Sequence, residues 1–139
     1  MSDRPPIKAP QTDASTQEFW DAARRGVLRI KHCGDCGANH YYPRPFCPKC
    51  WSTNVAWMDA AGTGTLYTYS VVYANDLPSF RDRVPYVVAI VELDEGPRME
   101  TNVVDCPLDE LRVGMRVAIV FEDEGEMVLP RFRPAESPA

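Results

Sequence analysis

The sequence lacks any long apolar stretch. No run approaches the ~20 apolar residues that a membrane-spanning helix needs, and residues 1–6 contain no apolar signal-peptide region. We therefore expect a cytoplasmic protein with no membrane partner, whose cysteines stay reduced.

A basic surplus is also missing. The chain carries 15 Lys and Arg residues against 20 Asp and Glu residues, which gives a net charge of −5 at pH 7. Proteins that neutralise phosphate backbones usually need excess positive charge, so nucleic acid is a disfavoured partner.

Catalytic motifs are absent as well. We find no glycine-rich phosphate loop and no Gly-x-Ser-x-Gly elbow. The two histidines, His32 and His40, flank the first cysteine pair described below, where we expect surface or supporting roles rather than metal ligation. Acidic residues are plentiful, but they fall in predicted turns, in which solvated charge is the ordinary role. The sequence thus predicts no active site in this chain.

What the sequence does contain is a paired cysteine pattern. Two residues separate Cys33 from Cys36 and Cys47 from Cys50, and ten residues lie between the pairs. Each pair spans one tight turn, so all four sulfur atoms can converge on one ion. Four thiolates fill a tetrahedral shell and leave no position for water or substrate, which is typical of a structural zinc site. Sulfur ligation alone also fits iron.

The residues after the two cysteine pairs differ. Gly37 follows the first pair, where a glycine readily adopts the positive φ that points backbone N–H groups at sulfur. Trp51 follows the second pair, and because a bulky residue at positive φ is strained, we expect a less regular turn there. The fifth cysteine, Cys106, stands alone and is either a small hydrophobic residue at a strand end or a reactive thiol.

A short helix is predicted over residues 16–25. Ser15 and Glu18 have the spacing of a capping box at its start, and Gly26 suits its C-terminal end. Such a short helix is not stable alone in water, so its apolar side must pack on something.

Phe19 and Trp20 dominate that apolar side. They either plug the protein's own core or anchor the chain on a partner, because aromatic residues are enriched at interface hot spots.

Short β-strands fill most of the remaining chain. Val, Tyr and Thr cluster between turns rich in Gly and Pro, with a break at residues 62–64. The predicted strands cover residues 27–30, 55–58, 66–73, 86–93, 99–104, 115–122 and 127–132, with a helical turn within 107–112. Five short strands after the break fit a small closed barrel, of which the five-stranded oligonucleotide/oligosaccharide-binding (OB) barrel is the commonest. We predict a mainly β protein.

Four regions are predicted along the chain. Residues 1–14 form a flexible arm, 15–61 the helix and zinc ribbon, 62–134 the OB-fold domain and 135–139 a tail.

One strand of the barrel carries aromatic residues at period two. Tyr67, Tyr69, Val71 and Tyr73 are expected on one face, as core or inter-module contacts, as a base-stacking platform or as a partner surface. Scattered arginines have two possible roles, as ordinary surface charges or as contacts to the phosphates of an acidic ligand. They are Arg81, Arg83, Arg98, Arg131 and Arg133.

These motifs together resemble the DUF35 family, in which a rubredoxin-like zinc ribbon precedes an OB-fold domain. The resemblance covers about residues 16–134. It is carried by Phe19-Trp20 with Gly26 and Leu28, Cys33-Gly34-Asp35-Cys36-Gly37, Tyr42-Pro43-Arg44-Pro45-Phe46-Cys47-Pro48-Lys49-Cys50, Gly62-Thr63-Gly64-Thr65-Leu66-Tyr67-Thr68-Tyr69, Pro85-Tyr86, Val91-Glu92-Leu93-Asp94-Glu95-Gly96, Gly114-Met115 and Pro130-Arg131-Phe132-Arg133-Pro134. Trp51, in place of a small residue, departs from the family pattern.

The resemblance implies an accessory role. Members of this family look like non-catalytic subunits of thiolase-superfamily enzymes, including thiolases and the thiolase-like aldolases of steroid side-chain breakdown. It implies a hetero-oligomer with a thiolase-fold protein that carries the catalytic residues, and acyl-CoA possibly shared with that partner. The alternatives are a free-standing acyl-CoA-binding protein and a nucleic-acid-binding zinc ribbon with an OB fold.

Two sets of contact residues follow as hypotheses. The first set would bind the partner and comprises Phe19, Trp20, Tyr41, Tyr42, Arg44 and Phe46. The second would reach the phosphates of CoA and comprises Arg131 and Arg133.

Overall fold

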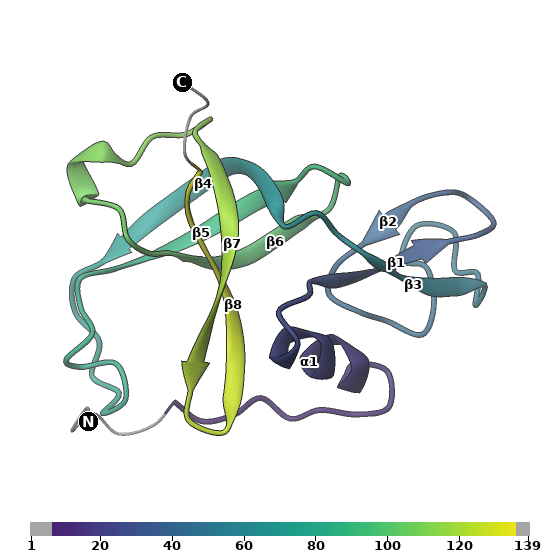
Figure 1. Ribbon diagram of the computed structural model, residues 1–139, viewed down its shortest axis with the longest axis horizontal. Helices are drawn as coiled ribbons and strands as arrows, with labels where there is room; N and C mark the ends of the chain where they lie inside the picture. The colour runs from purple at the N-terminus through teal and green to yellow at the C-terminus, as the bar shows by residue number, and fades with distance from the viewer. Residues whose placement is uncertain (1–6, 136–139) are drawn as a thin grey trace.

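One helix, a small three-stranded sheet and a closed barrel make up the described part of the chain (Figure 1). The structure is a computed structural model and describes residues 7–135. The first six residues of the predicted arm and the last four of the predicted tail therefore lie outside it. The elements are α1 (Gln17–Arg24), β1 (Arg29–Cys33), β2 (Asn39–His40), β3 (Val55–Asp59), β4 (Thr63–Val72), β5 (Tyr86–Leu93), β6 (Arg98–Val103), η1 (Leu108–Glu110), β7 (Arg116–Glu124) and β8 (Met127–Pro134).

The helix begins differently from the predicted capping box. Thr16, not Ser15, is the N-cap residue, and its side chain makes no capping hydrogen bond. The carboxylate of Asp13 instead accepts hydrogen bonds from the backbone N–H groups of Ser15 at 2.9 Å and Thr16 at 3.1 Å. Glu18 turns away and pairs with Arg29 at 2.7 Å. An aspartate three residues upstream thus replaces the predicted serine, because its carboxylate accepts several hydrogen bonds at once.

The helix ends as predicted at Gly26. This residue has a φ of 77°, and its N–H donates to the carbonyl of Ala23 at 3.0 Å. The next N–H, of Val27, reaches back to Ala22 at 2.9 Å. This left-handed turn reverses the chain from α1 into β1.

The ribbon sheet has the order β2-β1-β3, and both pairs are antiparallel. The strand β1 lies in the centre and carries the first metal-site cysteine at its end, where Cys33 pairs with Val55. The sheet therefore fixes one end of the cysteine region against β3.

The barrel closes in the order β4-β5-β6-β8-β7, with β7 pairing back onto β4. All neighbours are antiparallel except β6 and β8, which run parallel and meet at the pair Val103–Phe132. This five-stranded arrangement, preceded by the ribbon, confirms the predicted fold class.

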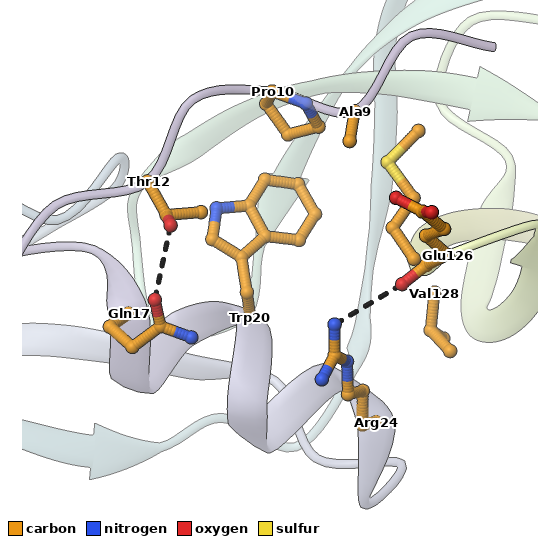
Figure 2. Close-up of a pocket in the computed structure, with 9 residues that line it drawn as sticks. Ala9, Pro10, Thr12, Gln17, Trp20, Arg24, Glu126 and Val128 are labelled. Atoms are coloured by element: carbon orange, nitrogen blue, oxygen red, sulfur yellow. Dashed lines mark hydrogen bonds between the residues drawn. The ribbon is translucent and has the colours of Figure 1, made fainter.

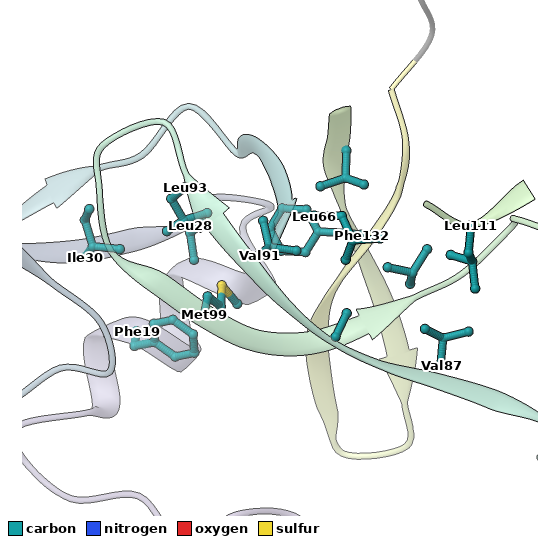
Figure 3. Packing of buried hydrophobic residues seen from close by; sticks show 13 residues of the cluster. Phe19, Leu28, Ile30, Leu66, Val87, Val91, Leu93, Met99, Leu111 and Phe132 are labelled. Carbon is teal, nitrogen blue, oxygen red and sulfur yellow. The ribbon is translucent and has the colours of Figure 1, made fainter. Parts of the chain in front are cut away.

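One hydrophobic core joins the helix, the ribbon and the barrel (Figure 3). Phe19 of α1 is only 2% exposed, and Ile30 of β1 is fully buried. They belong to the same cluster as Leu66, Met99 and Phe132 of the barrel. The predicted regions 15–61 and 62–134 therefore pack against each other through one core.

The aromatic row on β4 does not form one face. A register irregularity between Leu66 and Thr68 interrupts the alternation, and Tyr67 is exposed beneath the guanidinium of Arg98 at 3.8 Å. Beyond the irregularity Tyr69 and Val71 pack against the core. The expectation that all four residues share one face is therefore wrong at Tyr67, because a bulge shifts the residues before it to the opposite face, while Tyr69 and Val71 make core contacts.

Candidate metal centre and partner surface

Four cysteine sulfur atoms gather at the outer end of the ribbon. Their Sγ atoms all lie within 4.8 Å of one another, with Cys33–Cys50 and Cys36–Cys47 both at 3.6 Å. A tetrahedron of sulfur atoms around zinc has edges of about 3.8 Å, since each Zn–S bond is about 2.3 Å long. The cysteines predicted from spacing are thus positioned to bind one metal ion.

Backbone N–H groups help to hold the thiolates. The N–H of Cys36 points at the sulfur of Cys33 at 3.5 Å, and the N–H of Lys49 points at the sulfur of Cys47 at 3.4 Å. Hydrogen bonds, that from the backbone N–H of Cys36 foremost, lower the pKa of Cys33 to about 6, and backbone N–H groups, that of Cys50 foremost, lower the pKa of Cys47 as well. The pKa of Cys50 goes the other way: against a hydrogen bond from the backbone N–H of Ser52, burial and the neighbouring thiols raise it to about 12. Because thiolates are the form that binds metal, the backbone prepares Cys33 and Cys47 for binding, whereas Cys50 loses its proton only when a cation is bound.

The donor set is closed. Cys33 and Cys47 are buried, whereas Cys36 and Cys50 face outward. Four sulfur ligands complete a tetrahedral shell, so the ion supplies folding energy and cross-links two loops rather than activating water. Of the two histidines nearby, His32 is hydrogen-bonded to Asn39 at 2.7 Å, and the Nε2 of buried His40 accepts the N–H of Arg44 at 3.3 Å. The Nδ1 of His40 is buried without a hydrogen-bond partner among the described residues.

The two cysteine turns have matching backbones but different residues at the same point. Gly37 has a φ of 78° and donates its N–H to the carbonyl of Cys33 at 3.0 Å. Trp51 has a φ of 68° and donates to Cys47 at 2.8 Å. The second turn is therefore as regular as the first, contrary to our expectation. Its regularity is maintained against a strain of about 1–2 kcal/mol for a non-glycine residue in this conformation.

The predicted partner-binding aromatics mostly pack inside the chain. Phe19 is buried, so its proposed role as an exposed anchor is wrong. Its ring lies 5.0 Å from that of Trp20, 5.7 Å from Tyr41 and 5.4 Å from Tyr42. The indole N–H of Trp20 donates to the hydroxyl of Tyr42 at 2.9 Å, and burial raises the pKa of Tyr41. This aromatic cluster connects α1 to the loop before the second cysteine pair.

Trp20 of α1 is half-buried beneath the N-terminal arm (Figure 2). The arm crosses over its ring at Ala9 and Pro10, and the β7–β8 hairpin closes the other side, where Arg24 donates to the carbonyl of Glu126 at 3.1 Å. The cavity left beside the ring measures about 270 Å³. The chain itself thus covers much of the surface that Trp20 was predicted to offer.

One exposed aromatic pair lies beside the second cysteine pair. Phe46 and Trp51 stack at 5.3 Å with an angle of 10° between their rings, and Trp51 is 72% exposed. Arg44 is exposed close by in the sequence. The partner-binding set predicted from the sequence includes Arg44 and Phe46 but not Trp51.

The two predicted phosphate-binding arginines have different surroundings. Arg131 is 14% exposed and pairs with Glu122 at 2.8 Å and Glu124 at 3.0 Å. Glu124 also binds Arg83 at 2.8 Å. A phosphate at Arg131 would compete with these two carboxylates, and the predicted contact stays a prediction. Arg133 is exposed and stays a prediction.

The fold and the site define a zinc ribbon joined to an OB-fold barrel, and comparison with known proteins identifies the family. Family models match residues 20–56, as the rubredoxin-like zinc ribbon domain of ChsH2, and residues 57–122, as its C-terminal OB-fold domain. A DUF35 domain-containing scaffold protein of Methanocaldococcus jannaschii is 37% identical over 76% of this chain and 79% of its own length. The chain belongs to the DUF35 family.

Other similar proteins are subunits of enzymes. A probable enoyl-CoA hydratase alpha subunit of Thermomonospora curvata is 42% identical over 84% of this chain, but the match spans only 37% of that protein. The 3-oxo-4,17-pregnadiene-20-carboxyl-CoA hydratase alpha subunit of Mycobacterium tuberculosis is 29% identical over 91% of this chain and 40% of its own length. The chain thus spans well under half of these two relatives.

A solved structure described as the Ltp2-ChsH2(DUF35) aldolase matches along nearly its whole length. It has a TM-score of 0.81 and 36% identity, covering 91% of this chain and 98% of the matched chain. Within residues 7–135, no helix has the length and apolar character needed to cross a membrane.

Proposed function

We propose that this chain is a non-catalytic, zinc-binding accessory subunit of a thiolase-superfamily enzyme that acts on acyl-CoA, in steroid side-chain or related degradation. The observation that carries this proposal is the match to the Ltp2-ChsH2(DUF35) aldolase, which covers 98% of the matched chain at 36% identity. A subunit of the same size and fold, described as part of an aldolase, supports a similar place in a hetero-oligomer.

The chemistry of the chain supports a structural role. Its metal ligands, Cys33, Cys36, Cys47 and Cys50, fill a tetrahedral shell and leave no position for substrate. The four sulfur atoms lie within 4.8 Å of one another, so each cysteine is accounted for as a metal ligand and none is left over as a nucleophile at this site. The catalytic residues are therefore assigned to the partner.

The names of the relatives support acyl-CoA as the substrate class. Two of them are called alpha subunits of hydratases that act on CoA thioesters, one with a steroid skeleton. Hydratase activity is not carried over to this chain, because the matched region is only 37% and 40% of those proteins. The two hydratase names support a CoA thioester as the substrate class. The name of the solved structure supports an aldolase as the kind of enzyme that contains a DUF35 chain.

The two alternative functions would give different experimental results. A free-standing acyl-CoA-binding protein would bind acyl-CoA without a partner enzyme. Of the two arginines predicted to reach CoA phosphates, Arg133 is the exposed one. A nucleic-acid-binding protein would lose affinity steeply with salt, which the net charge of −5 disfavours.

Size-exclusion chromatography with light scattering tests the proposal. The full chain is mixed with a purified thiolase-superfamily protein from the same organism, and each protein is also run alone. We expect one hetero-oligomer with a fixed ratio of the two chains. Separate elution of the two proteins, combined with micromolar binding of acyl-CoA by the chain alone, would favour the free-standing carrier.

A further inference from the structure

One loop connects the cysteine site to the helix. We define the connecting loop as residues 41–46, which join β2 to Cys47. The loop is fixed at its start because β2 pairs with β1, and in its middle because the N–H of Arg44 donates to Nε2 of buried His40 at 3.3 Å. Its far end is followed directly by a metal ligand. The ribbon sheet and the sulfur atoms of the metal site therefore determine the path of this loop.

We propose that the connecting loop makes the packing of α1 depend on metal binding, so that the chain carries a reversible, metal-sensitive switch. When the four cysteines hold one ion, Tyr41 and Tyr42 hold α1 against the seam between β6 and β8. When the ion is lost, the loop changes its path and the helix is released. This inference goes beyond the accessory role and does not depend on it.

The first argument is that the connecting loop supplies much of the surface on which α1 packs. The ring of Phe19, which is 2% exposed, lies 5.7 Å from that of Tyr41 and 5.4 Å from that of Tyr42. The indole N–H of Trp20 donates to the hydroxyl of Tyr42 at 2.9 Å. Both tyrosines belong to the loop, so a change in its path removes three contacts of the helix at once.

The second argument is that α1 has little stability of its own. It has eight residues, and helices shorter than about 12–15 residues are marginal in water unless they pack on the rest of the protein. The helix contacts β1, which belongs to the ribbon sheet, and β8, which belongs to the barrel. Loss of the ribbon contacts should therefore release α1 as a unit while the barrel keeps its own strand pairs.

The third argument is the part of the barrel that α1 covers. Among residues 7–135, β6 and β8 share one residue pair, Val103–Phe132, whereas β5 and β6 share six. Pro130 of β8 has no backbone N–H to donate across this seam. Figure 1 shows α1 between β8 and the ribbon, and Trp20 and Tyr41 line a cavity of about 170 Å³ together with residues of β6 and β8. Release of α1 would uncover strand edges that favour association with other chains.

Hydrogen–deuterium exchange of the full chain, followed by mass spectrometry, tests the switch. Exchange is measured with zinc bound, after a chelator has removed the zinc, and after zinc has been added back. The first reporter segment is residues 17–24 of α1. The second is residues 86–93 of β5, a strand that pairs with β4 and β6 inside the barrel.

Removal of zinc should affect the helix more than the barrel. Each of the three contacts between loop and helix contributes a factor of about two to ten to the opening equilibrium. Because all three are lost together, the exchange rate of residues 17–24 should rise at least about tenfold more than that of residues 86–93. Adding zinc back should restore the original rates in both segments.

Two variants test whether the connecting loop carries the effect. Tyr42→Phe removes the hydroxyl that accepts the indole N–H of Trp20, so with zinc bound it should raise the exchange rate of α1 about two- to tenfold. Tyr69→Phe is the matched control, because its hydroxyl donates to the carbonyl of Leu111 at 3.4 Å within the barrel. This control should leave the exchange rate of α1 unchanged.

Four results would overturn the switch. Unchanged exchange of α1 after zinc removal would show that the helix does not depend on the metal. An equal rise in residues 86–93 would show that the metal stabilises the whole chain rather than the helix. Equal effects of Tyr42→Phe and Tyr69→Phe on α1 would exclude the connecting loop as the link. Irreversible precipitation, or rates that added zinc does not restore, would show that the metal is needed only for folding.

Discussion

Phe19→Ala tests whether the N-terminal helix belongs to the protein's own core. Phe19 is 2% exposed and contacts three other aromatic rings at 5.0–5.7 Å. Removing a buried phenylalanine side chain costs about 3–5 kcal/mol, from lost burial and the cavity that is left. For a chain of 139 residues we expect the unfolding temperature to fall by about 10–15 °C.

The assay is thermal and urea unfolding of the isolated chain, followed by circular dichroism, with zinc content measured before each run. Phe19→Leu is the control, because it keeps most of the buried apolar volume and should cost less than about half as much. An unfolding temperature for Phe19→Ala within 2–3 °C of the native value, a shift worth about 1 kcal/mol or less, would refute the assignment of Phe19 to the core. It would return this residue to the partner surface predicted from the sequence.

Three further changes have defined outcomes. Cys47→Ser should abolish binding of the single zinc ion and unfold the ribbon while the barrel partly survives, because structural zinc contributes about 10–16 kcal/mol of apparent folding energy in zinc-finger peptides. Elemental analysis measures the zinc, and full zinc content in the variant would contradict this prediction. Glu124→Gln should lower the free energy of unfolding by about 2–3 kcal/mol in urea titrations, because Arg83 and Arg131 both lose a largely buried carboxylate. Hydrogen bonds from the Arg116 guanidinium, and secondarily from Thr63, lower the pKa of Asp94 from 3.8 to about 2. A carboxyl group whose pKa is depressed by folding stabilises the protein above its unfolded pKa and loses that effect as the pH falls. In the native chain the unfolding temperature should therefore fall between about pH 4 and pH 2, and Asp94→Asn should make this fall smaller. The same dependence of unfolding temperature on pH in both proteins would contradict the ion pair.

The zinc ligands and the barrel were predictable because their signals are local. The spacing of the four cysteines determines how their sulfur atoms can meet, whatever the rest of the chain does. Turn residues such as those at 94–97 mark the ends of strands, and the structure has β5 ending at Leu93 and β6 beginning at Arg98. Five strands in succession then leave few closed arrangements.

The partner surface was less predictable because exposure depends on contacts between distant residues. Phe19 is buried by Tyr41 and Tyr42, and no local pattern in the helix reveals those contacts. Arg131 meets Glu122 and Glu124 because β7 and β8 are paired in one particular register. The sequence therefore left open whether Phe19 packs in the core or on a partner, and it indicated an irregular turn at Trp51 without indicating that this side chain is exposed.

The most direct test of the accessory role is a titration of enzyme activity. The purified thiolase-like protein is held at a fixed concentration, the zinc-loaded chain is added in steps, and carbon–carbon cleavage of an acyl-CoA thioester is followed. We predict no turnover by the chain alone and a rate that rises with added chain to a sharp break at a fixed molar ratio. Turnover by the chain alone, or a rate of the thiolase-like protein that does not change when the chain is added, would contradict the role of a non-catalytic accessory subunit.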